Sequence, residues 1–153
     1  MTNLTKPTSI LTGVAGEYFV AAELSRRGYI ASISLRNTRG IDILATSQDG
    51  RRSITIQCKT SLRTTKKWML NEKAETFEAR NHFYVFVCLG DVTERPLFHI
   101  VPSKTVAKRV SEEHRRWIAS PGIKGQKHNE SAVRNFRDPS DEFLERWDLL
   151  GLG

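Results

Sequence analysis

The chain has 153 residues, of which 39% are hydrophobic and 27% are charged, which fits a single globular domain over residues 1–153 and argues against extended disorder. Its two cysteines, Cys58 and Cys88, are not spaced as a metal-binding pair, so we expect neither a disulfide framework nor a thiolate zinc site, and a reduced, cytoplasmic setting. The net charge of +7 favours an anionic partner, and no apolar run is long enough to predict a membrane span.

Hydrophobic periodicity and turn residues predict alternating helices and strands. The first helix is expected over residues 12–27, capped by Thr12, ended by Gly28 and, from side chains such as Tyr18 and Phe19, buried on most sides. Three strands follow over residues 29–35, 40–46 and 53–60, then a helix over 73–81 and two strands over 82–89 and 97–101. This order predicts an α/β core of about residues 12–101, with a three-stranded meander in a mixed central sheet.

The remaining residues, 103–153, are expected to form a helical and loop extension. A helix is predicted over residues 103–118. Residues 120–137 contain Pro121, Gly122 and Gly125, which indicate a long loop or lid before a short helix capped by Ser140 and ended by Gly151.

The turn at Asp49-Gly50 predicts the register of the second and third strands. If these two residues form the hairpin loop, paired positions sum to 99 and one face is apolar, with Ala45 opposite Ile54, Ile43 opposite Ile56 and Ile41 opposite Cys58. On the other face Asp42 lies opposite Gln57, and Lys59 lies beside Gly40. An acid, an amide and an amine therefore converge.

These groups suit a hard divalent cation. Asp42 supplies a carboxylate, while the Gln57 side-chain carbonyl and the Cys58 backbone carbonyl are neutral oxygen ligands of the kind that Mg²⁺ accepts. Lys59 would orient or deprotonate a metal-bound water, or balance charge on a phosphate. The simpler alternative, an Asp–Lys ion pair on a solvated strand face, stays open.

A second carboxylate stands out on the first helix. The positions around Glu17 on its face hold Gly13, Val20 and Ala21, which are small or apolar, so burying Glu17 would require a cation from elsewhere. Glu23 differs, because Arg26 and Arg27 follow it at helical spacing and predict an ordinary surface pair.

Three segments together resemble a known family. Gly16-Glu17 on the helix, Gly40-Ile41-Asp42-Ile43 on one strand and Ile56-Gln57-Cys58-Lys59-Thr60-Ser61 on the next are similar to the PD-(D/E)XK nuclease superfamily of restriction-endonuclease-like fold, and within it to archaeal-type Holliday-junction resolvases and small relatives carrying Q-x-K. The resemblance implies cleavage of DNA with Mg²⁺ or Mn²⁺. It makes Asp42 the central metal ligand, Gln57 the replacement of the usual acid, Lys59 the catalytic lysine and Glu17 the helical acid.

Two residues depart from the family pattern. Ile41 stands at the motif's proline, which matters little. Gln57 occupies the position of the motif's second acid, so the metal site has one negative charge fewer. The alternative to an active nuclease is therefore a catalytically inactive nucleic-acid-binding module on the same fold.

Basic residues cluster in the same part of the chain. Residues 24–67 hold ten basic and two acidic residues, a surplus expected of a polyanion site, with a solvated basic face as the simpler alternative. Candidate DNA contacts are Arg39, Arg63, Lys66 and Lys67, and Trp68 could stack on a base, although a solvated loop anchored by a core tryptophan is the commoner outcome for such a run. The expected partner is DNA, branched or otherwise structured, with RNA not excluded and a homodimer as a candidate assembly. A scaffold that docks an acidic protein is a weaker third interpretation.

Overall fold

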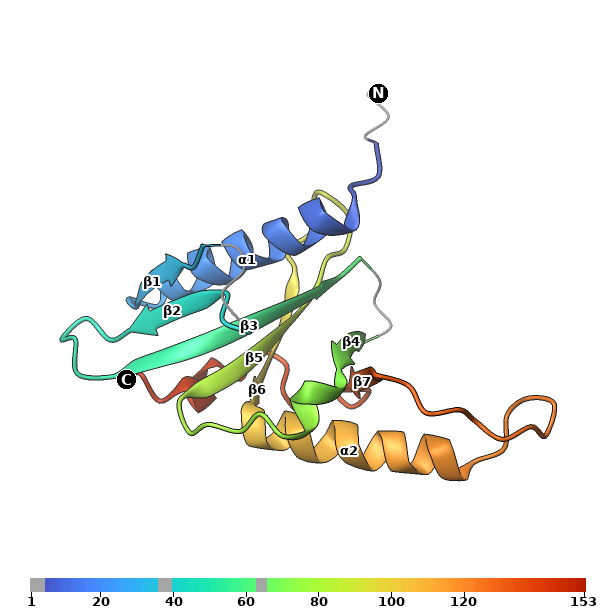
Figure 1. Cartoon of the computed structure of the whole chain (residues 1–153). Coiled ribbons are helices and arrows are strands. Elements are labelled where there is room, and N and C mark those ends of the chain that lie inside the picture. Colours follow the sequence, from blue (N-terminus) through green and yellow to red (C-terminus); the bar gives the residue numbers. More distant parts are fainter. Residues whose placement is uncertain (1–4, 36–39, 63–65) are drawn as a thin grey trace.

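A computed structural model describes residues 5–35, 40–62 and 66–153 (Figure 1). Its central sheet has five strands in the order β1-β2-β3-β5-β6, with β1 at Ile30–Ile33, β2 at Ile43–Thr46, β3 at Ser53–Ser61, β5 at His82–Cys88 and β6 at Leu97–Pro102. β3 and β5 are parallel, and the other neighbours are antiparallel. The expected α/β fold with a meander and a mixed sheet is confirmed.

Helix α1 (Ser9–Arg26) covers one face of this sheet. Thr8 caps it by accepting a hydrogen bond from the Leu11 N–H, and the chain leaves it through Gly28, whose φ of 86° is a left-handed conformation that glycine adopts readily. Its buried side chains, Val20 and Leu24, pack with apolar residues of β2, β3, β5 and β6, among them Ile43, Ile56, Val85 and Phe98, and Ala31 of β1 packs against the same cluster. This packing forms the first core.

Helix α2 (Ser103–Ala119) and a two-stranded antiparallel sheet cover the opposite face (Figure 1). The small sheet pairs β4 (Lys67–Asn71) with β7 (Val133–Arg137), and a short 3-10 helix, η1 (Glu72–Glu75), follows β4. Trp68 and Phe136 pack here with Tyr84 and Phe86 of β5. Since every residue of β5 is buried, this strand supplies side chains to both cores.

The C-terminal segment returns from the second face to the first. After β7 it forms a 3-10 helix, η2 (Trp147–Leu150), whose Trp147 and Leu150 join the core beneath α1. Gly151 ends η2 with a φ of 63°. The predicted short C-terminal helix is therefore reduced to a single turn, but its predicted end at Gly151 is correct.

Several predicted boundaries were wrong for identifiable reasons. The helix expected over residues 73–81 is only the turn η1. Beyond it the chain is held by the start of α2, where the Ser103 hydroxyl accepts from the Ala79 N–H and donates to the Ala79 carbonyl, which also accepts from the His82 N–H. The loop expected over residues 120–137 ends in β7, where a buried Arg134 hides the alternation of a strand. Strand β4 was not predicted.

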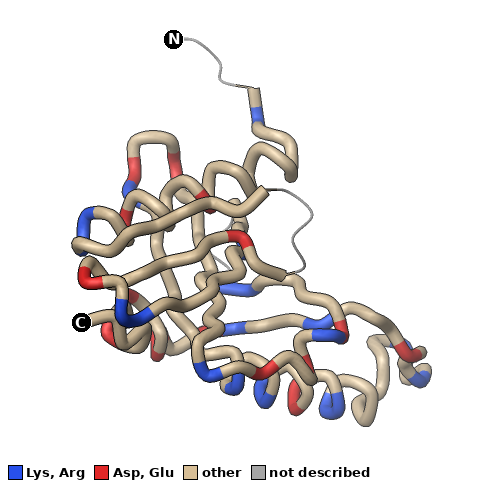
Figure 2. Tube along the Cα trace, turned by 60° about the vertical axis from the view of Figure 1, so that its left-hand side comes forward, with Lys and Arg blue, Asp and Glu red and all other residues tan. Residues whose placement is uncertain are grey.

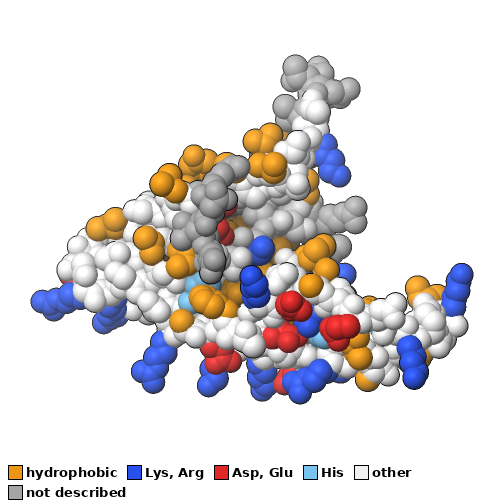
Figure 3. Space-filling model, viewed as in Figure 1, with side chains coloured by type: hydrophobic (Ala, Val, Ile, Leu, Met, Phe, Trp, Pro, Cys, Tyr) orange, Lys and Arg blue, Asp and Glu red, His pale blue; other side chains and the backbone are white. Residues whose placement is uncertain are grey.

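Predictions for the first helix also need correction. Thr12 is not the cap: it lies inside the helix, and its hydroxyl donates to the Thr8 carbonyl oxygen. Tyr18 and Phe19 are exposed, whereas Glu23 is buried under Arg26, Arg27 and, from the loop before β6, Arg95. Figure 3 shows apolar side chains on the outer surface over α1 and β1, where Ile10, Leu11, Tyr18, Phe19, Ile30 and Ile33 are exposed.

Within the described residues, neither helix has the length and apolar character needed to cross a bilayer.

Candidate active site

The β2–β3 hairpin has the register expected from the sequence. Ile43 pairs with Ile56 and Ala45 with Ile54, so paired positions do sum to 99. The loop is longer than predicted: Ser47 N–H donates to the Arg52 carbonyl, and residues 48–51 form the turn. Asp49 and Gly50 are still at its centre, so the extra length adds one residue to each side and leaves the register unchanged.

Asp42 lies where β2 separates from β3. The strand pairing ends at Ile43, and the Asp42 N–H donates to the Ile56 carbonyl at 2.8 Å. The Asp42 carboxylate then accepts a hydrogen bond at 2.7 Å from the Cys58 backbone N–H, at the edge of β3 that β2 no longer covers. Asp42 is thus fixed by the backbone of β3 rather than by a ladder position opposite Gln57.

The surroundings of Asp42 have opposing effects on the pKa of its carboxyl group. Burial raises the pKa of the Asp42 carboxyl above its ordinary 3.8, while the Cys58 N–H and the positive charge of Lys59 act in the opposite direction. The charge of Lys59 therefore acts on the Asp42 carboxylate, with Asp42 at the open edge of β3 and Lys59 lining the groove beside the same strand.

Gln57 and Lys59 project from β3 into a groove of about 670 Å³. Gly40 lies on one side of it, and a β-carbon there would be 3.7 Å from the Gln57 side-chain oxygen, so this oxygen faces the segment that leads to Asp42. Residues of β4, η1 and the segment after it form the other side, with Asn71, Lys73, Phe77 and Tyr84 of β5 among them. These wall residues were not predicted, because the groove exists only once the unpredicted β4 packs against β3.

Glu17 approaches the same edge from the helical side. Burial is the main cause that raises the pKa of the Cys58 thiol well above its usual range, and the negative charges of Asp42 and Glu17 raise it further. Both negative charges therefore act on Cys58, and Asp42 also contacts it directly through the backbone N–H. Glu17 is half-buried on α1, which covers the face of the sheet opposite the groove. Asp42 lies at the open edge of β3, between the face covered by α1 and the face that lines the groove.

The donor set fits a hard cation with few protein ligands. Within the described part of the chain, no three His, Cys, Asp or Glu side chains gather as ligands. The available groups are the Asp42 carboxylate, the Gln57 amide oxygen and the Cys58 carbonyl, which faces the same open edge as its N–H. One carboxylate with neutral oxygens matches the way Mg²⁺ binds when water and substrate phosphate complete its shell.

The candidate DNA contacts are distributed differently from the expectation. Arg39 and Arg63 lie outside the described residues. Lys66 is bound to Asp141 at 2.6 Å, while Lys67 is exposed on β4. Trp68 is only 2% exposed, packs on Phe86 and donates from Nε1 to the Val87 carbonyl, so it is the core tryptophan of the commoner interpretation and is not placed to stack on a base.

Comparison with known proteins supports the fold. No family model and no curated protein matches the sequence. Among solved structures, the bacterial homing endonuclease I-Ssp6803I matches over 97% of this chain and 95% of its own, with a TM-score of 0.56 and 16% identity. The Holliday junction resolvase Hjc of Archaeoglobus fulgidus, an archaeal hyperthermophile, matches over 82% of this chain and 84% of its own, with a TM-score of 0.44 and 15% identity. The chain therefore shares its fold with the homing endonuclease, in agreement with the restriction-endonuclease-like fold expected from its sequence motifs.

Proposed function

We propose that this chain is a metal-dependent endonuclease that hydrolyses DNA phosphodiester bonds, in repair, recombination or restriction of foreign DNA. The observation that carries the proposal is the position of Asp42, which is hydrogen-bonded to the Cys58 N–H at the open edge of β3, the strand that also carries Gln57 and Lys59 into the groove. The fold shared with a homing endonuclease supports the same class of activity.

Each residue has a distinct role in this proposal. Asp42, the Gln57 amide oxygen and the Cys58 carbonyl hold Mg²⁺ or Mn²⁺, with Glu17 as a further acid near the same edge. The bound cation supplies Lewis-acid polarisation of the phosphate. Lys59 lies beside the groove, where its ammonium group stabilises charge that develops on the phosphate or holds the attacking water in line.

A cleavage panel tests the proposal. Supercoiled, linear, branched and single-stranded DNA are incubated with Mg²⁺ or Mn²⁺ and wild-type protein, Asp42→Asn or Lys59→Ala. Each variant removes one charge at the site and should lose at least about a hundred-fold in rate, as expected when a metal ligand or a charge-stabilising group is removed. The matched controls are Asp91→Asn and Lys124→Ala, both exposed and away from the groove, and they should cleave like the wild type.

The same panel separates the alternatives. An inert wild type that still binds DNA would favour the binding module, for which the replacement of the second acid by Gln57 is the specific argument. Cleavage that survives both site variants would contradict the assigned residues. If binding to any polyanion shows no dependence on salt, an acidic protein partner is the better explanation. The homodimer remains a prediction that sedimentation analysis can test.

A further inference from the structure

The β4–β7 pair forms an antiparallel ribbon separate from the central sheet. Its register places Lys67 opposite Arg137, Met69 opposite Asn135 and Asn71 opposite Val133. The intervening side chains, Trp68, Leu70, Arg134 and Phe136, are buried against the body of the protein. Because side chains alternate along a strand, the residues of the three pairs named first form the outer face of the ribbon. We call this surface the ribbon face; it consists of Lys67, Met69, Asn71, Val133, Asn135 and Arg137.

The ribbon face has an unusual composition. It carries two cations, two amides and two apolar side chains, and none of its six residues is acidic. Met69 is 66% exposed at its centre, although a methionine there gains nothing from contact with water. Lys67 and Arg137 stand directly opposite each other, an arrangement of like charges that is unfavourable in a sheet. Arg137 is partly compensated by an ion pair with Glu113 at 2.9 Å.

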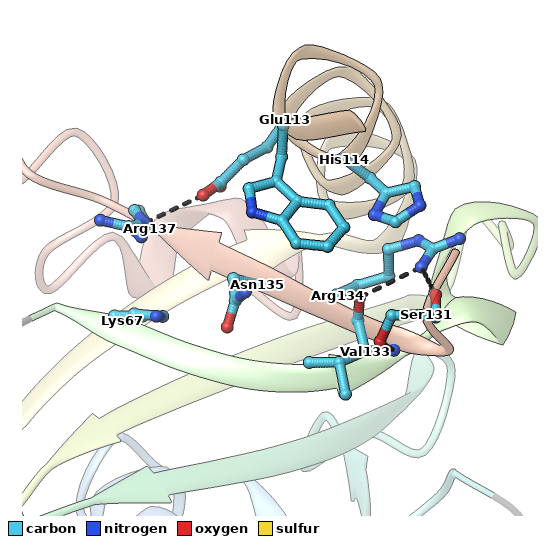
Figure 4. A pocket seen from close by; sticks show the side chains of 9 residues that line it. Lys67, Glu113, His114, Ser131, Val133, Arg134, Asn135 and Arg137 are labelled. Carbon is cyan, nitrogen blue, oxygen red and sulfur yellow. Dashed lines mark hydrogen bonds and ion pairs between the residues drawn. The ribbon is translucent and has the colours of Figure 1, made fainter. Parts of the chain in front are cut away.

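A hollow of about 220 Å³ continues this surface toward α2 (Figure 4). Lys67, Asn135 and Arg137 of the ribbon line it together with Trp117 of α2, which is 40% exposed and stacks on His128 at 4.1 Å between ring centroids. The carboxylates around it are already engaged, Glu113 by Arg137 and Glu130 by His114. Figure 2 shows further Lys and Arg residues along the neighbouring α2, interspersed with acids.

The ribbon face also adjoins the candidate active site. Asn71, at the end of β4, lines the groove that contains Gln57 and Lys59. Asn71 therefore belongs to both surfaces, and a duplex held at the groove would meet the ribbon face at this residue.

We propose that the ribbon face reads the base sequence of duplex DNA from its major groove, next to the point of cleavage. The proposal rests on the proposed function, because it names the part of the substrate that the nuclease recognises. The major groove is about 12 Å wide and admits a two-stranded ribbon. Lys67 and Arg137 match guanine acceptors or phosphates, Asn71 and Asn135 match adenine, and Met69 and Val133 match the thymine methyl group.

The groove can be identified without any cleavage. Duplex DNA from a randomised pool is selected for binding to Lys59→Ala protein, and the selected duplex is then treated with dimethyl sulfate, which methylates guanine N7 in the major groove and adenine N3 in the minor groove. Binding should enrich a base preference, and methylation at guanine N7 should reduce binding at least about ten-fold, whereas methylation at adenine N3 should not.

Variants assign the contact to the ribbon face. Asn135→Ala and Met69→Ala should each relax the preference at discrete positions, and Lys67→Ala should reduce the slope of log affinity against log salt by about one. Asn129→Ala, Val92→Ala and Lys124→Ala replace the same or a similar type of side chain at exposed positions elsewhere and should behave like the parent protein. Circular dichroism confirms that each variant is folded.

The outcomes distinguish this inference from the proposed function. If the ribbon variants keep the parent's base preference and salt slope, or if adenine N3 methylation is the modification that blocks binding, the ribbon inference is wrong while cleavage by the wild type still supports a nuclease. If the wild type cleaves only single-stranded DNA and does not bind duplex DNA, the ribbon inference is likewise wrong while the proposed nuclease function is supported. A wild type that neither binds nor cleaves any DNA removes both proposals.

Discussion

Gly16 of α1 lies so close to Thr60 of β3 that a β-carbon on Gly16 would overlap the Thr60 hydroxyl oxygen. This contact holds the helix backbone against the strand that carries Gln57 and Lys59. It also fixes the position of the next residue, Glu17, whose charge raises the pKa of the Cys58 thiol on the same strand. The packing of α1 on β3 is therefore part of what assembles the candidate site.

We expect Gly16→Ala to lower the free energy of unfolding by about 1–3 kcal/mol, because the added methyl group must displace a packed strand side chain. Gly13, on the same helix, has no atom within 4 Å of a β-carbon built on it, so Gly13→Ala should raise the free energy of unfolding by about 0.5–1 kcal/mol through its helix propensity. Urea unfolding measures both. The double variant with Thr60→Ala should recover part of the loss, and equal effects of the two alanines would contradict the contact.

A pH dependence is expected from His82. Burial lowers the pKa of this histidine from 6.5 to about 4, and its Nδ1 is hydrogen-bonded to the Thr55 hydroxyl at 2.7 Å. Between these two pKa values the unfolded chain binds a proton that the folded chain does not. The contribution of His82 to the free energy of unfolding is therefore complete above pH 6.5. It is lost as the pH drops toward 4, which lowers the free energy of unfolding by about 2–3 kcal/mol. Unfolding curves at several pH values should show this loss in the wild type and a smaller one in His82→Gln; an identical slope in both would assign it to other groups.

The sequence was most informative where local pairing and packing agree. The register of β2 and β3 followed from apolar alternation around Asp49-Gly50, and a loop longer than assumed did not alter it, because the extension is symmetrical. Strands β4 and β7 were missed because they pair across more than sixty residues of chain, and their pattern is masked by the buried Arg134, which is bound to Glu75. The local sequence around either strand therefore does not indicate that the other strand will pair with it.

For the candidate site, residue types were predictable and geometry was not. Asp42, Gln57 and Lys59 could be placed near one another from the hairpin alone. The hydrogen bond from the Cys58 N–H to Asp42 could not, because it depends on β2 beginning at Ile43, three residues later than the predicted start at Gly40. The groove wall formed by Asn71 and Phe77 depends on tertiary packing of β4 and η1 against the sheet. Glu23 was misjudged because its third cation, Arg95, comes from a distant loop.

The pair of His99 and Asp138 should be important for stability. Both side chains are fully buried, and the Asp138 carboxylate is 2.8 Å from His99 Nδ1 and accepts hydrogen bonds from the N–H groups of Glu142 and Phe143. Asp138→Ala leaves these buried groups without their acceptor and should cost about 3–5 kcal/mol. Asp138→Asn, which keeps the shape and one acceptor oxygen, should cost less. Urea unfolding gives the comparison, and a cost below about 1 kcal/mol for the alanine variant would show that water replaces the carboxylate.

The last prediction concerns the residue at which the sequence departs from the PD-(D/E)XK pattern. Gln57→Glu restores an acid beside Asp42 and Lys59 in the groove. Without a cation, the second negative charge should raise the pKa of Asp42 further and lower the melting temperature, because two nearby carboxylates repel each other. With Mn²⁺ or Mg²⁺ the variant should melt at a higher temperature than the wild type, since the added charge attracts the cation. We expect the affinity for the metal ion to increase about ten-fold or more.

Calorimetric titration with Mn²⁺ and melting curves with and without the metal measure these effects. Gln126→Glu, at an exposed position outside the groove, adds the same charge and should change neither the metal affinity nor the metal-dependent rise in melting temperature. If Gln57→Glu binds Mn²⁺ no more tightly than the wild type, the Gln57 oxygen does not face the cation and must be removed from the ligand set. If it binds more tightly and also cleaves DNA faster, the amide limits metal binding in the natural protein, and the chain is a weakened nuclease rather than an inert binding module.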